Sequence, residues 1–311
     1  MAVDFVVEAE GLSYRYGRVQ AVKDLSLRVK KGEIYGLVGP DGAGKTTTIR
    51  MLSAVIPPQS GRAMVAGFDV LRESEKVKER IGYMAQRFNL YEDLTVQENL
   101  EFFADLYRVP KPLRRSREQE LLSFSRLEGF RGRLAQNLSG GMKQKLALAC
   151  TLIHSPQVLM LDEPTTGVDQ VSRREFWQIL SRLLREGVTI LYTTPYMDEA
   201  ERFSRLSFLS VGSVVVSNTP RGLKGLLESR ILEVEASPQF EAQGLITTVP
   251  GVQDVQRFGN RLHVLVRSIE VRERIMEVLE GRGISVLSVR EVTASLEDVF
   301  MNLSRPDRAL G

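Results

Sequence analysis

Hydrophobic positions in the first two-thirds of the chain gather in short apolar runs separated by segments of helical length. The runs Glu33–Val38, Val158–Leu161 and Val188–Thr193 predict buried strands. The first run leads into a glycine-rich turn and then a helix that extends through Leu52. Strands that alternate with helices are typical of a mostly parallel sheet covered on both faces. We therefore expect an α/β fold for this part of the chain.

The stretch from about residue 89 to residue 155 predicts mainly helices. Thr95 and Glu98 have the spacing of a capping box, and apolar residues follow at helical intervals. A second apolar stripe begins at Met142 and ends at Ile153. We therefore expect a helical subdomain over about residues 89–155. A basic cluster beside two prolines favours a solvated loop over a contact with lipid head groups; its members are Lys111, Arg114, Arg115 and Arg117.

The pattern changes near Ser217–Gly225, where Asn, Pro and Gly residues cluster and predict a boundary. Beyond it the apolar pattern predicts the order β-α-β-β-α-β, with a hairpin turn at Gly259-Asn260 and a final helix Leu296–Leu303. That order is typical of a ferredoxin-like domain. We therefore expect a first domain over residues 1–218 and a small α+β ferredoxin-like domain over residues 224–311.

Composition narrows the classes of partner. Acidic and basic residues are well mixed and the net charge is only +3, which argues against a nucleic-acid partner. A single cysteine excludes an intrachain disulfide framework and fits a reducing cytoplasm. No apolar run reaches the ~18–20 residues that a membrane-spanning helix needs, and the first ten residues lack the basic start of a signal peptide. A role at a membrane would therefore need a separate spanning chain.

A phosphate-binding loop occupies the turn after the first apolar run. Residues 39–46 have the spacing G-x-x-x-x-G-K-T between a predicted strand and a predicted helix. Glycines allow successive backbone N–H groups to point at phosphate oxygens. Lys45 is placed to reach the β- and γ-phosphates of a nucleotide, and Thr46 to bind Mg²⁺. The full predicted nucleotide-binding set of this loop is Gly39, Asp41, Gly42, Ala43, Gly44, Lys45, Thr46 and Thr47.

The run Val158–Leu161 ends in two adjacent carboxylates, Asp162 and Glu163. Two carboxylates at a strand end are costly unless a cation or a proton is near. Asp162 suits the Mg²⁺ shell, and Glu163 suits the polarisation of an attacking water.

A second anion site lies between these two motifs. Ser139, Gly140 and Gly141 open a predicted helix with a hydroxyl and bare backbone N–H groups. Because the chain already has one phosphate cradle, the second cradle needs another nucleotide. That requirement indicates a dimer that closes over ATP.

With the sequence Leu138–Met142 in this position, the chain resembles ATP-binding-cassette (ABC) ATPases over about residues 4–217. The resemblance implies that the Ser139–Gly141 segment contacts the γ-phosphate held by the opposite subunit. It also implies that Gln86 senses Mg²⁺ and water and touches a membrane partner. Tyr16 matches the aromatic residue that stacks on adenine, and Asp169 matches a loop that crosses the dimer interface.

Two residues depart from the family pattern. Asp41 stands where the family usually has Asn, a change that the backbone cradle should tolerate. Pro195 stands where the family usually has a histidine that contacts the γ-phosphate, and proline offers neither a side-chain donor nor a backbone N–H. Hydrolysis at the site built on Lys45 is therefore expected to be slow. The chain would then pair with a non-identical cassette, or form a homodimer with two slow sites.

The tail from about Lys224 resembles the accessory domain of ATPase subunits from bacterial type-2 ABC exporters such as those for drugs, on residues Ser295–Phe300. The resemblance implies an ATP- and Mg²⁺-dependent ATP hydrolase at the cytoplasmic face of the inner membrane, which powers a separate membrane-spanning permease. The alternative is a non-transport cassette that acts as an ATP-dependent clamp or regulator of a soluble assembly. A GTPase or small-molecule kinase would leave Leu138–Met142 unexplained.

Overall fold

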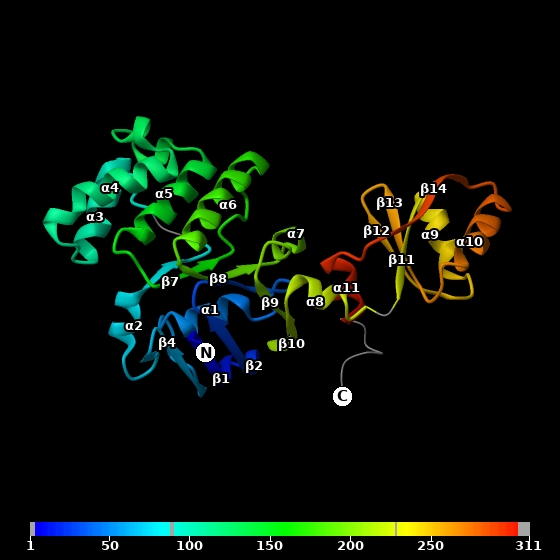
Figure 1. Ribbon diagram of the computed structural model, residues 1–311, viewed down its shortest axis with the longest axis horizontal. Coiled ribbons are helices and arrows are strands. Elements are labelled where there is room, and N and C mark those ends of the chain that lie inside the picture. Colours follow the sequence, from blue (N-terminus) through cyan, green and yellow to red (C-terminus); the bar gives the residue numbers. More distant parts are fainter. Residues whose placement is uncertain (1–3, 88–89, 228, 304–311) are drawn as a thin grey trace. The chain divides into compact units, whose positions relative to one another are not determined.

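The computed structural model describes residues 4–87, 90–227 and 229–303. The chain divides into two compact units, Met1–Ser217 and Asn218–Gly311 (Figure 1). The strands are β1 (Phe5–Tyr16), β2 (Val19–Lys30), β3 (Ile34–Val38), β4 (Ser60–Val65), β5 (Phe68–Asp69), β6 (Ile81–Met84), β7 (Val158–Asp162), β8 (Thr189–Thr194), β9 (Arg205–Ser210), β10 (Ser213–Asn218), β11 (Arg230–Ser237), β12 (Val252–Phe258), β13 (Arg261–Val266) and β14 (Ser285–Val292). The helices are α1 (Lys45–Leu52), α2 (Ser74–Arg80), α3 (Val96–Leu106), α4 (Lys111–Ser125), α5 (Gly140–Leu152), α6 (Gln170–Arg185), α7 (Met197–Ala200), α8 (Pro220–Lys224), α9 (Gln239–Thr247), α10 (Val271–Glu280) and α11 (Leu296–Leu303). Residues 1–3, 89 and 304–311, which bound the predicted domains and subdomain, lie outside the described residues.

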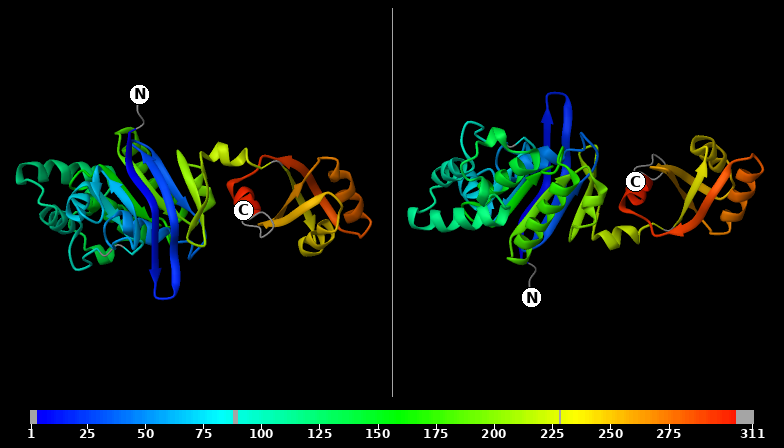
Figure 2. Two further views of the ribbon diagram at one scale, coloured as in Figure 1. Left: turned by 90° about the horizontal axis from the view of Figure 1, so that it is seen from below. Right: turned by 90° about the horizontal axis from the view of Figure 1, so that it is seen from above.

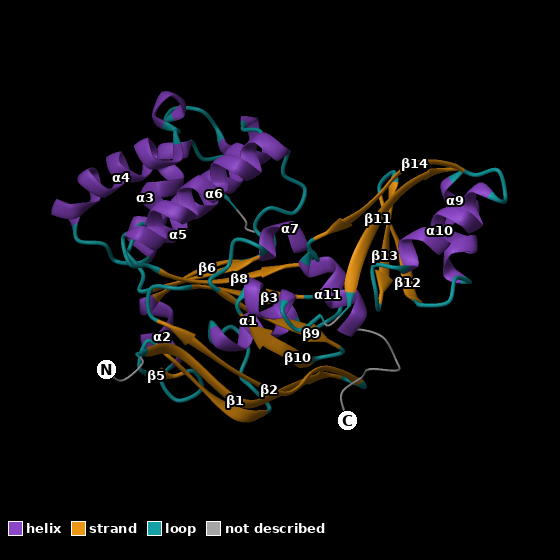
Figure 3. Ribbon diagram, turned by 45° about the vertical axis from the view of Figure 1, so that its right-hand side comes forward, coloured by secondary structure: helices purple, strands orange, loops and turns teal. Residues whose placement is uncertain are grey.

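A six-stranded sheet with the order β10-β9-β3-β8-β7-β6 forms the centre of the first unit. β3 pairs in parallel with β8 and β9, and β7 pairs in parallel with β6 and β8. Every residue of β3, β7 and β8 is buried, as expected for parallel strands that are covered on both faces. Figure 3 shows helices on both sides of this sheet. The predicted α/β fold with a parallel sheet is confirmed.

A second sheet, β2-β1-β4-β5, is antiparallel, and the sequence interpretation did not include it. Figure 2 shows its two long strands, β1 and β2, as a ribbon in blue. The helix α1 packs in one hydrophobic core with residues of both sheets; the core includes Val7, Leu25, Leu37, Ile49, Met51 and Leu191. Because α1 is held from both sides, the loop before it has a fixed position.

The first unit contains the helices α3, α4 and α5 within residues 90–155, and the predicted bounds of the helical subdomain stay a prediction. The core of these helices contains Leu100, Leu122, Leu146 and Cys150, and burial raises the pKa of the Cys150 thiol. The capping box is present, because Thr95 accepts a hydrogen bond from the Glu98 N–H and the Glu98 side chain accepts one from the Thr95 N–H.

The basic cluster at residues 111–117 is helical, so the prediction of a loop there is wrong. The two prolines lie at the start of α4, where a missing N–H costs nothing, and they begin the helix rather than break it. Arg114 pairs with Asp105 and donates to the Val109 carbonyl, and Arg117 donates to the Ile153 carbonyl. These two arginines therefore hold α4 against its neighbours.

The second unit contains an antiparallel sheet with the order β12-β13-β11-β14. The helices α9 and α10 follow β11 and β13 in the chain, and both cover one face of the sheet (Figure 3). This order and connectivity are those of a ferredoxin-like domain, so the predicted fold of the tail is confirmed.

The last helix, α11, packs against α8, the first helix of the same unit. The imidazole Nδ1 of His263 on β13 lies 2.9 Å from Oδ1 of Asp298 on α11. Burial opposes charge on this imidazole, but the hydrogen bond to Asp298 and the negative charges of Asp298 and Glu233 raise the pKa of His263. The pKa of Asp298 is lowered, because hydrogen bonds from His263 and Ser295 outweigh burial. The hydrogen bond between His263 and Asp298 thus joins α11 to the sheet.

Candidate active site

The carboxyl ends of four parallel strands meet at one edge of the central sheet. The loop at residues 39–44 follows β3, Gln86 follows β6, Glu163 follows β7 and Pro195 follows β8. In open α/β sheets ligands bind at this edge, beside the strand where the chain order reverses. β3 is such a strand, because the successive strands β8 and β9 lie on opposite sides of it.

The loop after β3 has a shape that only glycine permits at two positions. Gly44 caps α1 with φ +97°, and a Cβ there would lie 2.4 Å from the Ala21 carbonyl oxygen. A Cβ on Gly39 would lie 2.3 Å from the Leu209 carbonyl oxygen. Asp41 and Gly42 are exposed, whereas Ala43 and Thr47 are buried. The loop therefore presents its backbone at the start of α1, where free N–H groups favour an anion.

Lys45 is buried and paired within the protein. Its Nζ donates to the carbonyl oxygens of Gly39 and Pro40 at 2.8 Å and 3.0 Å. The same Nζ lies 3.1 Å from Oε1 of Glu163, and both side chains are less than one-tenth exposed. Because breaking a buried ion pair is costly unless a new partner replaces the old one, this lysine is suited to exchange a carboxylate for a phosphate.

Glu163 is held by contacts on both its side chain and its backbone. Its Oε2 accepts a hydrogen bond from Nε2 of Gln86 at 3.0 Å. Its N–H donates to the carbonyl and hydroxyl oxygens of Thr193, at 3.1 Å and 3.0 Å. Its φ of +48° is uncommon for a residue with a side chain and is often found at functional sites. Thus Lys45, Gln86 and Glu163 are brought together as the sequence suggested.

Asp162 has one oxygen that is satisfied and one that is not. Its Oδ1 accepts from the hydroxyls of Thr193 at 2.7 Å and Thr46 at 3.1 Å. Its Oδ2 is buried and has no hydrogen-bond partner among the described residues. Burial raises the pKa of Asp162. A buried carboxylate oxygen without a partner, beside a threonine hydroxyl, fits the oxygen ligands that Mg²⁺ prefers.

Thr193 is a site residue that sequence reasoning missed. It lies directly opposite Asp162 in the β7–β8 register and contacts both carboxylate residues of the site. The signal in the sequence was the hydroxyl of Thr193 near the end of the mainly apolar strand β8, which pairs with β7. Pro195 lies two residues later and has neither a side-chain donor nor a backbone N–H.

The second predicted anion site lies at the adjacent starts of α5 and α6. Ser139 caps α5, and its Oγ accepts from the Met142 N–H. Asp169 caps α6, and the N–H of Ser172 lowers the pKa of Asp169. A Cβ on Gly141 would lie 2.1 Å from the Ser172 hydroxyl oxygen, whereas a Cβ on Gly140 would meet open space. Within the described part of the chain, no hydrogen bond or ion pair joins these helix starts to Lys45 or Glu163.

Tyr16 ends β1 and is 45% exposed. Its ring meets that of Tyr14 edge-on, with the centroids 4.8 Å apart. Burial opposes charge on Arg50 of α1, but hydrogen bonds to Tyr83 and Tyr16 raise the pKa of this guanidinium. The Tyr16 ring therefore lies near the helix that follows the phosphate loop.

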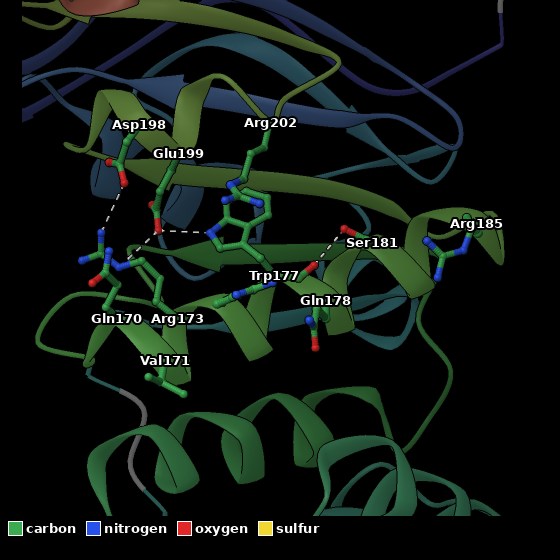
Figure 4. Close-up of a pocket in the computed structure, with 11 residues that line it drawn as sticks. Gln170, Val171, Arg173, Trp177, Gln178, Ser181, Arg185, Asp198, Glu199 and Arg202 are labelled. Atoms are coloured by element: carbon green, nitrogen blue, oxygen red, sulfur yellow. Dashed lines mark hydrogen bonds and ion pairs between the residues drawn. The ribbon is translucent and has the colours of Figure 1, made fainter.

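A cavity of about 810 Å³ is lined by residues of α6 and by residues in and directly after α7 (Figure 4). Its lining combines charged and aromatic side chains and includes Arg173, Trp177, Glu199 and Arg202. In Figure 4, Glu199 points from α7 toward Trp177 and Arg173 of α6.

Within the described residues, no helix is both long enough and apolar enough to cross a membrane.

Comparison with known proteins places these features in a family. The family model for ABC transporters matches residues 22–166, and a model described as the C-terminal domain of DrrA1-3-like ATP-binding proteins matches residues 219–304. A probable multidrug ABC transporter ATP-binding protein, YbhF of Escherichia coli (strain K12), is 39% identical over 96% of this chain and 52% of its own length. The chain thus spans about half the length of that relative. The daunorubicin resistance ATP-binding protein DrrA2 of Streptomyces coeruleorubidus is 36% identical over 96% of this chain and 95% of its own length.

Solved structures agree with the sequence relatives. An ATP-binding subunit of an ABC transporter has a TM-score of 0.65 and 27% identity, over 71% of this chain and 92% of its own. A dimeric ATP-binding cassette in a post-hydrolysis state, bound to ADP and Pi, has a TM-score of 0.63 and 28% identity, over 68% of this chain and 98% of its own. The chain therefore belongs to the family of ABC transporter ATP-binding proteins.

Proposed function

We propose that this chain is the ATP-binding and ATP-hydrolysing subunit of an ABC exporter and powers a separate membrane-spanning permease. The observation that carries this proposal is the group formed by Lys45, Gln86, Asp162 and Glu163 at the carboxyl edge of the central sheet. The relatives support the direction of transport, because they include proteins named for multidrug transport, daunorubicin resistance and Nod factor export. The proposed location is the cytoplasmic face of the membrane that holds the permease.

The proposed chemistry assigns a task to each side chain of the group. The N–H groups of the loop at residues 39–44 and of the first turn of α1 bind the phosphates of ATP, and Tyr16 stacks on the adenine. Lys45 leaves Glu163 and binds the β- and γ-phosphates. Glu163, released from the lysine, orients and polarises the attacking water, and Gln86 holds the carboxylate in position.

Mg²⁺ fits beside Asp162 and Thr46, with Gln86 nearby. The unpartnered Asp162 Oδ2 and the Thr46 hydroxyl are the oxygens that would hold the ion. A bound Mg²⁺ supplies positive charge to the terminal phosphates. The protein contributes the fixed orientation of Asp162, which the Thr193 hydroxyl provides.

The segment Ser139–Gly141 and Asp169 are proposed to act on the nucleotide of a second cassette. Ser139 and Gly140 stand at the start of α5, where an anion is stabilised by free N–H groups and by the helix dipole. A solved relative of this cassette is dimeric with ADP and Pi, which supports a dimer that closes over nucleotide.

The site built on Lys45 is proposed to hydrolyse ATP slowly, because Pro195 offers no donor to the γ-phosphate. In a mixed pair, the partner's phosphate loop would use the intact Ser139–Gly141 segment of this chain and form the faster site. A homodimer would instead contain two slow sites.

Affinity purification of the tagged chain from native membranes tests the proposed assembly. A membrane-spanning chain that copurifies in detergent supports the exporter. A second, different cassette in the same complex supports the mixed pair. A complex that contains the membrane-spanning chain and this cassette in equal amounts, with no other cassette, supports the homodimer. Copurification with a soluble assembly and no membrane-spanning chain would overturn the exporter function.

A further inference from the structure

Glu199 is a buried carboxylate to which no role in hydrolysis has yet been given. It lies on α7, directly after the segment that contains Pro195, and is 1% exposed. Its Oε1 accepts from the hydroxyl of Thr165 at 2.6 Å and from the indole N–H of Trp177 at 3.3 Å. Its Oε2 accepts from the hydroxyls of Thr194 at 2.7 Å and Tyr192 at 3.1 Å. Burial and the negative charge of Glu199 raise the pKa of Tyr192.

The donors to Glu199 come from three segments that surround the proposed site. Thr165 lies two residues after Glu163, on the way to Asp169. Thr194 ends β8 and immediately precedes Pro195. Trp177 belongs to α6, the helix that Asp169 caps (Figure 4). The Glu199 carboxylate therefore connects the segment after Glu163, the segment before Pro195 and the helix α6.

These ties reach Glu163 through the backbone. Thr193, next to Thr194, accepts the N–H of Glu163 and fixes Asp162. On the other side, the N–H of Thr166, next to Thr165, donates to the Glu163 carbonyl at 3.2 Å. Glu163 also holds an uncommon backbone conformation, which persists only when its surroundings over-determine it.

We propose that Glu199 is a positioning residue for ATP hydrolysis, which holds the residues flanking Glu163 and Pro195 in the geometry that the reaction needs. Among the described residues its side chain has no hydrogen bond to Lys45, Gln86 or Glu163, and it acts through Thr165 and Thr194. This inference rests on the proposed function, because it takes Glu163 as the group that activates water. A shift of about 1 Å in a reacting group can lower the rate by about a hundredfold.

The test compares the variant Glu199→Gln with Glu163→Gln and with Asp198→Asn. An amide at residue 199 keeps the shape of the side chain. Its NH₂ group replaces one oxygen that accepts hydrogen bonds, so it cannot accept from the two donors on that side. Asp198 is a matched control, since it lies next to Glu199 on the same helix and its exposed carboxylate contacts Arg173 at 3.5 Å. The measurements are the ATP hydrolysis rate per nucleotide-binding site, with the sites counted by a fluorescent ATP analogue, and the Kd of that analogue.

We expect Glu199→Gln to lower the hydrolysis rate per site by about tenfold or more, with the Kd changed by less than about threefold, because the phosphate loop is not touched. Asp198→Asn should keep the parental rate and Kd. A merely structural role would reduce the number of binding sites and leave the rate per site unchanged. That result, or a rate within about twofold of the parent, would overturn the inference.

Two further variants keep the outcomes distinct. If Glu199→Gln does not fold, Thr165→Val removes, at nearly constant volume, the hydroxyl that contacts Glu199 at 2.6 Å and the Tyr192 hydroxyl at 3.2 Å. A fall in the rate per site is expected again, and an unchanged rate contradicts the inference. If Glu163→Gln hydrolyses ATP like the parent, the proposed role of Glu163 fails. If Glu163→Gln is inactive and Glu199→Gln is not, only the role of Glu199 fails.

Discussion

Lys45 and Glu163 form an ion pair with 3.1 Å between Nζ and Oε1, and both side chains are almost completely buried. The lysine that should bind phosphate is thus held by the carboxylate that should activate water. Under the proposed function, ATP binding requires this pair to open. The same event would then free Lys45 for the phosphates and Glu163 for the attacking water.

Glu163→Gln should abolish turnover and keep ATP bound. The amide cannot accept a proton from water, and it competes less well than a carboxylate for Lys45. We expect hydrolysis to fall by about a hundredfold or more, and ATP-bound dimer to accumulate in size-exclusion chromatography. Parental turnover in this variant would show that Glu163 is not the base.

Pro195→His should raise the ATP hydrolysis rate of the purified chain. A histidine there can donate to the γ-phosphate, and one well-placed donor is worth about a hundredfold in comparable sites, so a rise of about tenfold or more is expected. Pro195→Ala is the control, since it restores the backbone N–H without a side-chain donor. A normal family rate that Pro195→His leaves unchanged would rule out a damaged site, and an equal gain from Pro195→Ala would assign the defect to the backbone.

Asp162→Asn should remove the dependence of ATP binding on Mg²⁺. The amide oxygen can still accept from Thr46 and Thr193, so the local hydrogen bonds survive, but the charge that would hold the ion is lost. In the parent, EDTA should raise the Kd for ATP by about tenfold or more. In Asp162→Asn, the Kd should be the same with Mg²⁺ and with EDTA. A persistent EDTA effect would place the ion on other residues.

Gly141→Ala should destabilise the first unit, and Gly140→Ala should not. The new methyl group at residue 141 would overlap Ser172 on α6, whereas residue 140 faces open space. We expect a loss of about 1–3 kcal/mol in the free energy of unfolding for Gly141→Ala and a change below about 0.5 kcal/mol for Gly140→Ala. The fluorescence of Trp177, the single tryptophan, follows unfolding of this unit. Equal effects of the two variants would contradict the packing of α5 on α6.

The attachment of α11 should depend on pH through His263 and Asp298. The pKa of His263 is raised in the folded state, so its contribution is complete below its ordinary value of 6.5 and is lost as the pH rises through the folded-state value. The pKa of Asp298 is lowered, so its contribution is complete above its ordinary value of 3.8 and is lost as the pH falls through the folded-state value. After correction for the intrinsic rate, amide hydrogen exchange in α11 should be slowest between these limits. In His263→Gln the increase in the α11 exchange rate above about pH 6.5 should disappear. If this increase remains, another group controls the attachment of the helix.

Local patterns predicted most of the fold because the governing interactions are short-range. The strand Ile34–Val38, the capping box at Thr95 and the hairpin turn at Gly259-Asn260 each follow from neighbouring residues. The antiparallel sheet was missed because the pairing of β1 with β4 joins residues more than forty positions apart. The start of α4 was misread because Pro110 and Pro112 indicate a break equally well as a helix start.

The candidate site was predictable where a motif has a fixed spacing. Lys45, Thr46, Asp162 and Glu163 lie in such motifs, and the structure brings them together. The contacts of Thr193 were not predictable, because they depend on the register of β8 against β7. Those of Glu199 depend on three segments that meet only in the folded chain.

The packing of α8 against α11 brings the two ends of the second unit together. α8 is the first helix of this unit to be synthesised and α11 is the last, with the whole sheet between them. The contact between α8, whose Leu223 is fully buried, and α11 can therefore form only after the rest of this unit has been synthesised. A nonsense mutation before Leu296 would leave every strand of this sheet encoded and still expose the helix that follows the cassette, a form that proteolytic quality control would recognise.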